Sequence, residues 1–197
     1  MKKTILLSSI FLLILASCKQ KTINENIQES DQEIVENQLK TQGDSLSTIT
    51  QQFIVKNLTE AIQKEGLEYA VDFCNINAIG LTNSAVEHFT GKIQRISDKN
   101  RNSDNNLKTQ TDKDIFESFR KNEKLNDSLF KTETEYVYYK RINLAMPTCI
   151  QCHGKTEEIN PKVLSKIQKH YPNDKAQNYE LNDFRGLWKV TFNTSEN

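Results

Sequence analysis

The strongest constraint on what this chain can fold into is a C-x-x-C-H run at residues 149–153. This pattern is the attachment signature of c-type haem, in which two thiols add to the vinyl groups and the adjacent imidazole binds the iron. We therefore expect Cys149 and Cys152 to carry one covalent haem c, with His153 as an axial ligand. Haem would then supply much of the core of so small a domain.

Two other classes of site also use paired cysteines. A thioredoxin-like pair opens a helix after a strand and usually has small residues or proline between its thiols, whereas here Pro147 precedes the motif. A zinc half-site needs two further ligands, and the remaining candidates, Cys74, His88 and His170, show no paired spacing. A non-haem thiol or zinc module is kept as a third hypothesis.

The N-terminus predicts export from the cytoplasm. Two lysines precede an apolar run at residues 5–15, which is too short to span a membrane. The run ends in Leu-Ala-Ser-Cys at residues 15–18, which matches the bacterial lipobox. We expect residues 1–17 to be a lipoprotein signal peptide and Cys18 to carry a lipid; an ordinary secretory signal is the alternative. Lys19, in place of the aspartate that retains lipoproteins at the inner membrane, favours the periplasmic face of the outer membrane.

These assignments leave one of the four cysteines, Cys74, without a role. An unpaired thiol is unusual in an exported, oxidising compartment. Cys74 lies on an apolar helical stripe, so it is expected to face the interior. It is either an inert buried cysteine or a ligand to the iron.

Composition divides the chain into a tether and one domain. Residues 18–48 are rich in polar side chains and predict a tether, with a short helix at 27–39 as an alternative. Residues 49–195 suit a single domain. The 26 basic and 26 acidic residues balance, which argues against nucleic acid as a partner.

The periodicity predicts helices first and an antiparallel sheet afterwards. Helical stripes cover residues 46–64 and 67–81, interrupted at Gly66. A capping box at Thr111 and Asp114 opens another helix, and Pro161 begins one that ends near His170. Strands are expected at 92–97, 128–132, 135–144 and 187–193, the last with Leu187 pointing outward and Trp188 pointing into the core. This order indicates an α+β domain of PAS-like architecture. A small all-helical cytochrome c is disfavoured because both methionines precede the haem motif.

Several blocks together resemble a family of periplasmic c-type haem proteins with a PAS-like fold, mostly described as a domain of unknown function. The matching blocks are residues 70–74, 93–102, 146–154, 171–176 and 185–193, so the resemblance covers about residues 49–193. It implies a haem iron ligated by His153 and by a distant cysteine, Cys74. The chain departs from the family at Asn178 and Asn182, where glycine is usual.

Other residues are candidates for contacts around the haem or have structural roles. Arg95 and Arg101 are candidates for binding the haem propionates, and Met146 for packing against the haem edge. His88 is expected to be exposed at a helix end, and His170 to complement the dipole at the end of its helix.

Two functions are consistent with these predictions. The first is a membrane-anchored single-haem cytochrome that acts as a redox sensor or low-potential electron-transfer module, without catalysis. The second is a haem-based sensor of gas or a small ligand, or a haem enzyme, whose distal position is labile. Either would require a redox partner or a membrane signalling protein.

Overall fold

The computed structural model describes the backbone of residues 9–193 and the side chains of residues 31–193. The chain divides into two compact units, Met1–Gln38 and Leu39–Asn197. The second unit carries the C-x-x-C-H motif, together with the sheet and the helices around it. Within the described residues no helix is long and apolar enough to cross a bilayer.

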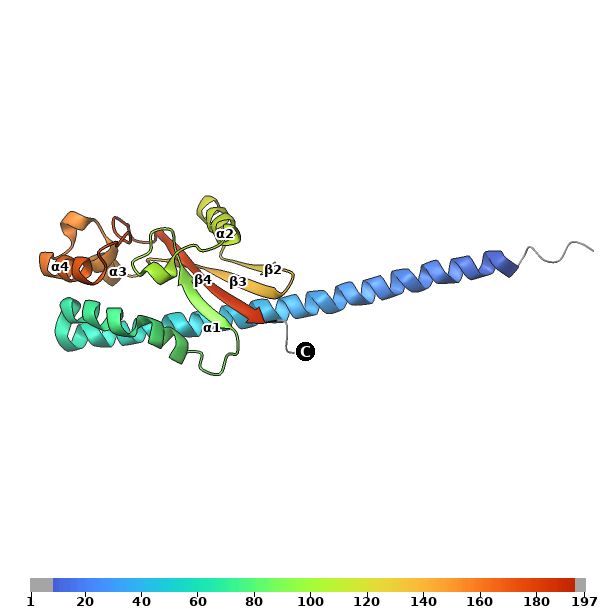
Figure 1. The fold of residues 1–197 in the computed structure, drawn as a ribbon, viewed down its shortest axis with the longest axis horizontal. Coiled ribbons are helices and arrows are strands. Elements are labelled where there is room, and N and C mark those ends of the chain that lie inside the picture. Colours follow the sequence, from blue (N-terminus) through green and yellow to red (C-terminus); the bar gives the residue numbers. More distant parts are fainter. Residues whose placement is uncertain (1–8, 194–197) are drawn as a thin grey trace, which may run out of the picture. The chain divides into compact units, whose positions relative to one another are not determined.

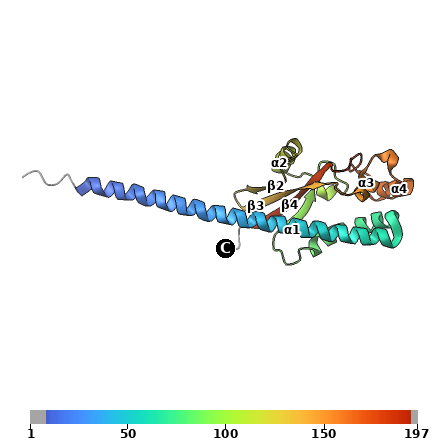
Figure 2. The same ribbon diagram turned by 180° about the vertical axis from the view of Figure 1, so that it is seen from behind.

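The first element, α1 (Ser9–Ser84), is broken at Gly66. Gly66 has φ 84° and ψ −176°, a conformation open almost only to glycine. The chain reverses there, and the segment after Gly66 runs back along the segment before it (Figures 1 and 2). The predicted interruption at Gly66 is confirmed.

The helix extends through the residues expected to form a tether. The second compact unit begins at Leu39, earlier than the predicted domain start at residue 49. Leu39 and Leu46 pack against the sheet, and Ser47 and Thr50 are fully buried. Both hydroxyls donate to carbonyls one turn back, so these polar residues enter the interior without an unsatisfied group. Gly43 belongs to the same contact, because a Cβ there would lie 2.4 Å from the Tyr138 ring.

The sheet has four antiparallel strands in the order β1-β4-β3-β2. They are β1 (Lys92–Ile96), β2 (Asp127–Lys131), β3 (Glu135–Asn143) and β4 (Phe184–Asn193). The predicted α+β class, with helices first and an antiparallel sheet afterwards, is confirmed.

Both faces of the sheet are covered. On one face α1 packs against a cluster formed by Ile93, Tyr136, Tyr138, Trp188, Val190 and Phe192. On the other, α2 (Gln110–Lys121) packs through Phe116 and Phe119 against Ile96, Val137, Tyr139 and Leu187. The prediction that Leu187 faces away from the core was wrong. Leu187 is fully buried because its face of the sheet is covered by α2.

The start of α2 also differs from the prediction. The capping box is formed by Thr109 and Asp112, not by Thr111 and Asp114. Asp112 has a second role: its carboxylate accepts from Tyr139 Oη at 2.9 Å and pairs with Lys189 Nζ at 2.7 Å. One acidic side chain therefore caps α2 and joins it to β3 and β4.

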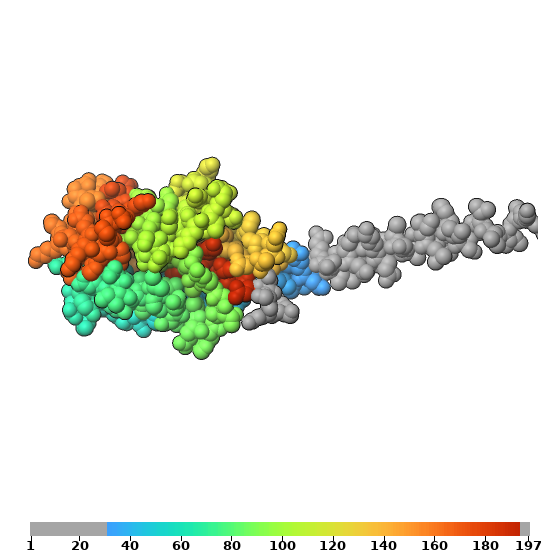
Figure 3. Space-filling view, viewed as in Figure 1, coloured from blue at the N-terminus to red at the C-terminus, as the bar shows by residue number. Residues whose placement is uncertain are grey.

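Three chain segments meet at one end of the sheet. The register pairs Ile96, at the end of β1, with Leu187, and Asn143, at the end of β3, with Phe184. Between β3 and β4 lie α3 (Pro147–His153), a short 3-10 helix (Thr156–Glu158) and α4 (Pro161–His170). In Figure 3 the orange surface of α4 lies over the green-blue part of α1 that comes after Gly66. Their contact is apolar, through Val71, Ile159, Val163 and Ile167.

Candidate functional site

The C-x-x-C-H motif forms the short helix α3. Pro147 stands in the first turn, where its missing N–H is not needed. Cys149 and Cys152 are three residues apart, so their side chains lie on the same face of the helix. Cys149 packs with Leu144, Ala176 and Tyr179, and Cys152 packs with the cluster between α1 and α4. Both thiols are free and half-buried.

His153 is oriented by a backbone carbonyl. Its Nδ1 donates to the carbonyl oxygen of Ala176 at 2.8 Å. Burial, and then the charges of Arg101, Arg185 and Arg95, hold the pKa of His153 well below its usual range. The ring is therefore neutral, with its proton on Nδ1 and the lone pair of Nε2 free. That is the form in which a histidine binds a metal ion.

Cys74 is part of the same site. It lies on α1 after Gly66 and is half-buried. Burial raises the pKa of its thiol, while Arg95 and Arg101 act in the opposite direction. The charge of Cys74 also raises the pKa of Cys152. Cys74 thus lies within electrostatic range of Cys152, and Cys74, Cys152 and His153 all have Arg101 as a charged neighbour.

Three arginines surround these residues: Arg95 and Arg101 come from β1 and the loop after it, and Arg185 comes from the start of β4. Arg95 lies on β1, 5.7 Å from the Trp188 ring, and Arg185 lies at the start of β4, where it donates to Ser97 Oγ at 2.9 Å. Burial lowers the pKa of both. Neither has a carboxylate within ion-pair distance among the side chains described between residues 31 and 193. Two half-buried guanidiniums without a carboxylate partner are suited to an anionic ligand.

Arg101 is engaged differently from the prediction. Its guanidinium is bonded to Asp174 and to the carbonyls of Cys152 and Ala176. Its Nε and Nη2 donors are therefore engaged by groups of the protein itself. For Arg95 the propionate role stays a prediction.

A cavity of about 700 Å³ reaches Arg95. It lies between the end of α1 and β1 and is lined by apolar and polar side chains, among them Ile79, Thr82, Phe89 and Ile93. Its lining does not include Cys149 or Cys152. Among the described residues of the candidate site, Arg95 is the one in the lining of this cavity.

The remaining predicted residues take up varied positions. Met146 is the half-buried N-cap of α3, and its carbonyl accepts from Cys149 N–H at 2.9 Å. His88 has a side chain 95% exposed, as expected. His170 lies in the last turn of α4, as expected, and its Nε2 is 2.7 Å from Asp72 on α1. Cys18 belongs to the stretch whose side chains lie outside the described residues.

The sequence did not point to the residues that hold His153. Ala176 acts through its backbone, and Asp174 lies 73 residues from its partner Arg101. The departures from glycine are explained: Asn178 and Asn182 have φ values of 61° and 72°. After glycine, asparagine is among the residues that best tolerate this left-handed conformation, so the loop keeps the course that glycine would give it.

Comparison with known proteins bears on the family and the fold of this chain. Residues 16–193 match the family model described as Tll0287-like. Among solved structures, the crystal structure of the cyanobacterial heme-protein Tll0287 has the same fold, with a TM-score of 0.56 and 19% identity. The likeness covers 78% of this chain and 98% of that one. No curated protein matches the sequence. The chain belongs to the Tll0287-like family.

Proposed function

We propose that this protein is a single-haem c-type cytochrome in which Cys149 and Cys152 hold the haem and His153 binds its iron. The observation that carries the proposal is the hydrogen bond from His153 Nδ1 to Ala176, because it leaves Nε2 free beside two unpaired thiols. The structural neighbour is described as a heme-protein, and the family match extends over the motif. Arg95 and Arg185 are suited to the two propionates.

Cys74 is proposed as the second iron ligand. It is the remaining free thiol among the described side chains, and it shares its arginine neighbours with His153. Bound haem would supply one-electron chemistry at a potential set by its ligands, and thiolate ligation favours the ferric state. A low reduction potential suits a redox sensor or a low-potential electron-transfer module better than a donor to a terminal oxidase.

The proposal places this module on the periplasmic face of a bacterial membrane, anchored by a lipid on Cys18. The short apolar run and the lipobox at residues 15–18 support the anchor. Its redox or signalling partner would then be a second protein at the same membrane.

One observation favours the alternative, a sensor with a labile distal position. Burial raises the pKa of the Cys74 thiol, which favours the protonated form, and that form is the weaker ligand. An exogenous ligand such as CO would then displace Cys74 from reduced iron. Rapid CO binding by the reduced protein would identify this function.

Covalent attachment is tested on protein produced in cells that mature c-type cytochromes. The denatured chain should stain for haem on a gel and exceed the apo-chain mass by one haem. Double replacement of Cys149 and Cys152 by alanine should abolish the stain, whereas Cys74→Ala should keep it. Haem that acid acetone extracts from the wild type would overturn the proposal.

A further inference from the structure

The guanidinium of Arg101 is bonded to two backbone carbonyls next to His153. Arg101 Nη2 donates to the carbonyl of Cys152, the preceding residue, at 2.6 Å. It also donates, at 3.2 Å, to the carbonyl of Ala176, the oxygen that accepts from His153 Nδ1. Arg101 is therefore bonded to the end of α3 and to the group that orients the imidazole.

A buried carboxylate holds this guanidinium in place. Asp174 accepts from Arg101 Nε at 3.2 Å and from Nη2 at 3.1 Å. Only 3% of the Asp174 side chain and 15% of the Arg101 side chain are exposed. Asp174 also accepts from the backbone N–H of Ala176 and the side-chain amide of Gln177, each at 2.9 Å. The same carboxylate thus fixes both Arg101 and the peptide that carries the Ala176 carbonyl.

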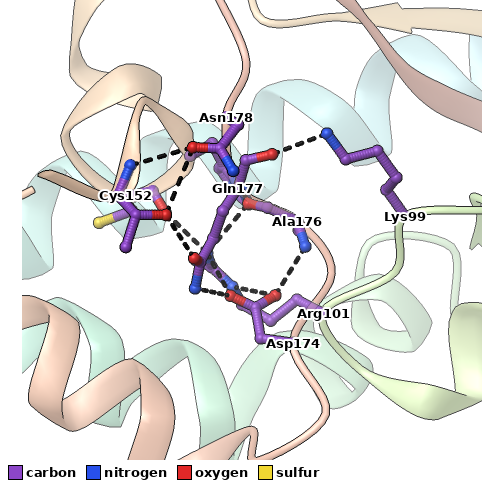
Figure 4. A network of polar contacts seen from close by, with 9 residues as sticks. Lys99, Arg101, Cys152, Asp174, Ala176, Gln177 and Asn178 are labelled. Carbon is purple, nitrogen blue, oxygen red and sulfur yellow. Dashed lines mark hydrogen bonds and ion pairs between the residues drawn. The ribbon is translucent and has the colours of Figure 1, made fainter.

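Figure 4 shows the loop that results. Lys99 Nζ donates to the carbonyl of Gln177 at 2.7 Å, and Asn178 N–H donates to the carbonyl of Gly154 at 2.8 Å. Tyr179 N–H donates to the carbonyl of His153 at 3.0 Å. These bonds hold the loop of residues 174–179 along the end of α3. Arg101 and Asp174 fix the direction of the Ala176 carbonyl.

We propose that Arg101 and Asp174 form a positioning pair that selects the Nδ1–H tautomer of His153 and fixes its ring plane. Neither side chain is assigned a bond to iron or to a propionate. Groups that bind the outer nitrogen of a metal-bound histidine set the orientation and donor strength of the ring. The effect on the iron rests on the proposed function, but the effect on the tautomer does not.

The pair needs arginine at residue 101. A planar guanidinium reaches a carboxylate and two carbonyls at once, whereas an ammonium is a point charge without that fixed geometry. Arg101→Lys should therefore behave like Arg101→Gln in geometry while it keeps the charge.

The test is the electron paramagnetic resonance spectrum of the ferric holoprotein, because its g-values report the orientation and bonding of the axial ligands. Wild type should give one set of g-values. Arg101→Gln, Arg101→Lys and Asp174→Asn should each give a shifted or second set, and the double Gln/Asn variant should change no further, since its two sites act as one unit.

The matched control is Arg141→Gln. Arg141 also ties a loop through carbonyls, those of Leu125, Asn122 and Phe119, but at the α2 side of the sheet. Arg141→Gln should lower the stability of the protein and leave the g-values unchanged. This control distinguishes a specific effect on His153 from a general loss of stability.

The two substitutions change the local charge in opposite directions, which distinguishes an electrostatic effect from an effect on the orientation of His153. Arg101→Gln removes a positive charge and Asp174→Asn removes a negative one, so a purely Coulombic effect moves the reduction potential in opposite directions. Opposite shifts with unchanged g-values, or a wild-type spectrum for Arg101→Lys, would overturn the proposal.

Haem staining is measured first, so that a failure of the proposed haem function can be distinguished from a failure of the positioning pair. A wild-type chain without covalent haem overturns the proposed function. On such a haem-free chain, in which no iron occupies Nε2, the ¹⁵N resonances of the His153 ring read the tautomer instead: Nδ1–H in wild type and a mixture in the variants supports the positioning pair, and one tautomer throughout refutes it.

Discussion

At the scale of single residues, the two ring nitrogens of His153 have separate surroundings. Nδ1 is bonded to a backbone carbonyl, while burial and three arginines keep the ring neutral. A backbone acceptor is not lost to any side-chain substitution at residue 176. The orientation of the imidazole therefore depends on the course of the loop from Asp174 to Asn178.

Cys74→Ser should change the iron spectrum if Cys74 is the second ligand. Serine is a poor donor to haem iron, so we expect high-spin or water-ligated iron, a shifted Soret band and a raised reduction potential. Absorption spectroscopy and spectroelectrochemistry measure this. Ile76→Ser, at a 77% exposed position of the same helix, is the control and should leave both unchanged. A wild-type spectrum for Cys74→Ser would show that another group holds the sixth position.

Asn182→Ala should destabilise the protein by about 1 kcal/mol, because the left-handed conformation disfavours a Cβ without a compensating side-chain bond. Asn182→Gly should match or slightly exceed wild type, since glycine adopts φ 72° freely. Urea denaturation of the two variants gives the comparison. Equal stability of the alanine and glycine variants would contradict the assigned backbone conformation.

The functional residues were predictable to different degrees. A short motif with fixed spacing made Cys149, Cys152 and His153 candidates, and an apolar stripe predicted an inward-facing Cys74, which the structure shows half-buried. The partner of Arg101 was not predictable, because an ion pair across 73 residues leaves no local pattern. Arg101 was for that reason assigned to a propionate, although Asp174 already binds it.

At the scale of elements, alternation and capping residues predicted most of the strands and helices, and the errors have local causes. Thr109 and Thr111 both stand three residues before an aspartate, so the sequence offers two capping boxes and packing selects the first. Leu187 was misplaced because alternation does not separate the faces of a sheet that is covered on both sides. Polar composition hid the helix at residues 39–48, whose buried serine and threonine hydroxyls bond to their own backbone.

Asp112→Asn should lower stability by about 3 kcal/mol at pH 7, because it leaves Lys189 without its anion in a mostly buried site. Burial raises the pKa of Asp112, but the bonds from Lys189, Tyr139 and Thr109 outweigh it, so the net shift is downward. A lowered folded-state pKa stabilises the protein above the unfolded value of about 3.9, and this contribution disappears as the pH falls through the folded value.

The difference between wild type and Asp112→Asn should therefore shrink below about pH 4. Denaturation midpoints at several pH values test this, with Asp104→Asn at an exposed position as the control. A constant difference from pH 7 to pH 3 would exclude the ionised carboxylate as its source.

At the scale of the whole molecule, the candidate site occupies the end of the sheet where β1 and β3 end and β4 begins. The β1 segment supplies Arg95 and Arg101, the β3 segment leads into the motif, and the β4 segment supplies Arg185. The break at Gly66 adds Cys74 from α1. The rest of the sheet is covered on both faces and forms the hydrophobic core of the domain.

Cys18→Ala should abolish incorporation of an alkyne fatty acid in cells that express the protein, because the lipobox places the acylated residue there. Gel fluorescence after click labelling measures incorporation. Cys74→Ala, which removes a different cysteine, should label like wild type. Equal labelling of wild type and Cys18→Ala would refute the anchor.

The reversal at Gly66 has a topological consequence. An iron bonded to both Cys74 and His153 would act as a cross-link around a stretch that includes β1, α2, β2 and β3. Closing a loop of roughly 80 residues restricts the unfolded chain by about 4.5 kcal/mol in the chain-entropy treatment used for disulfides. If reduction released Cys74, that loop would open, and the segment after Gly66 would lose its bond to the iron. The oxidation state of the iron would then set the local stability of the α1 segment after Gly66. A partner protein in contact with this segment would sense the change directly.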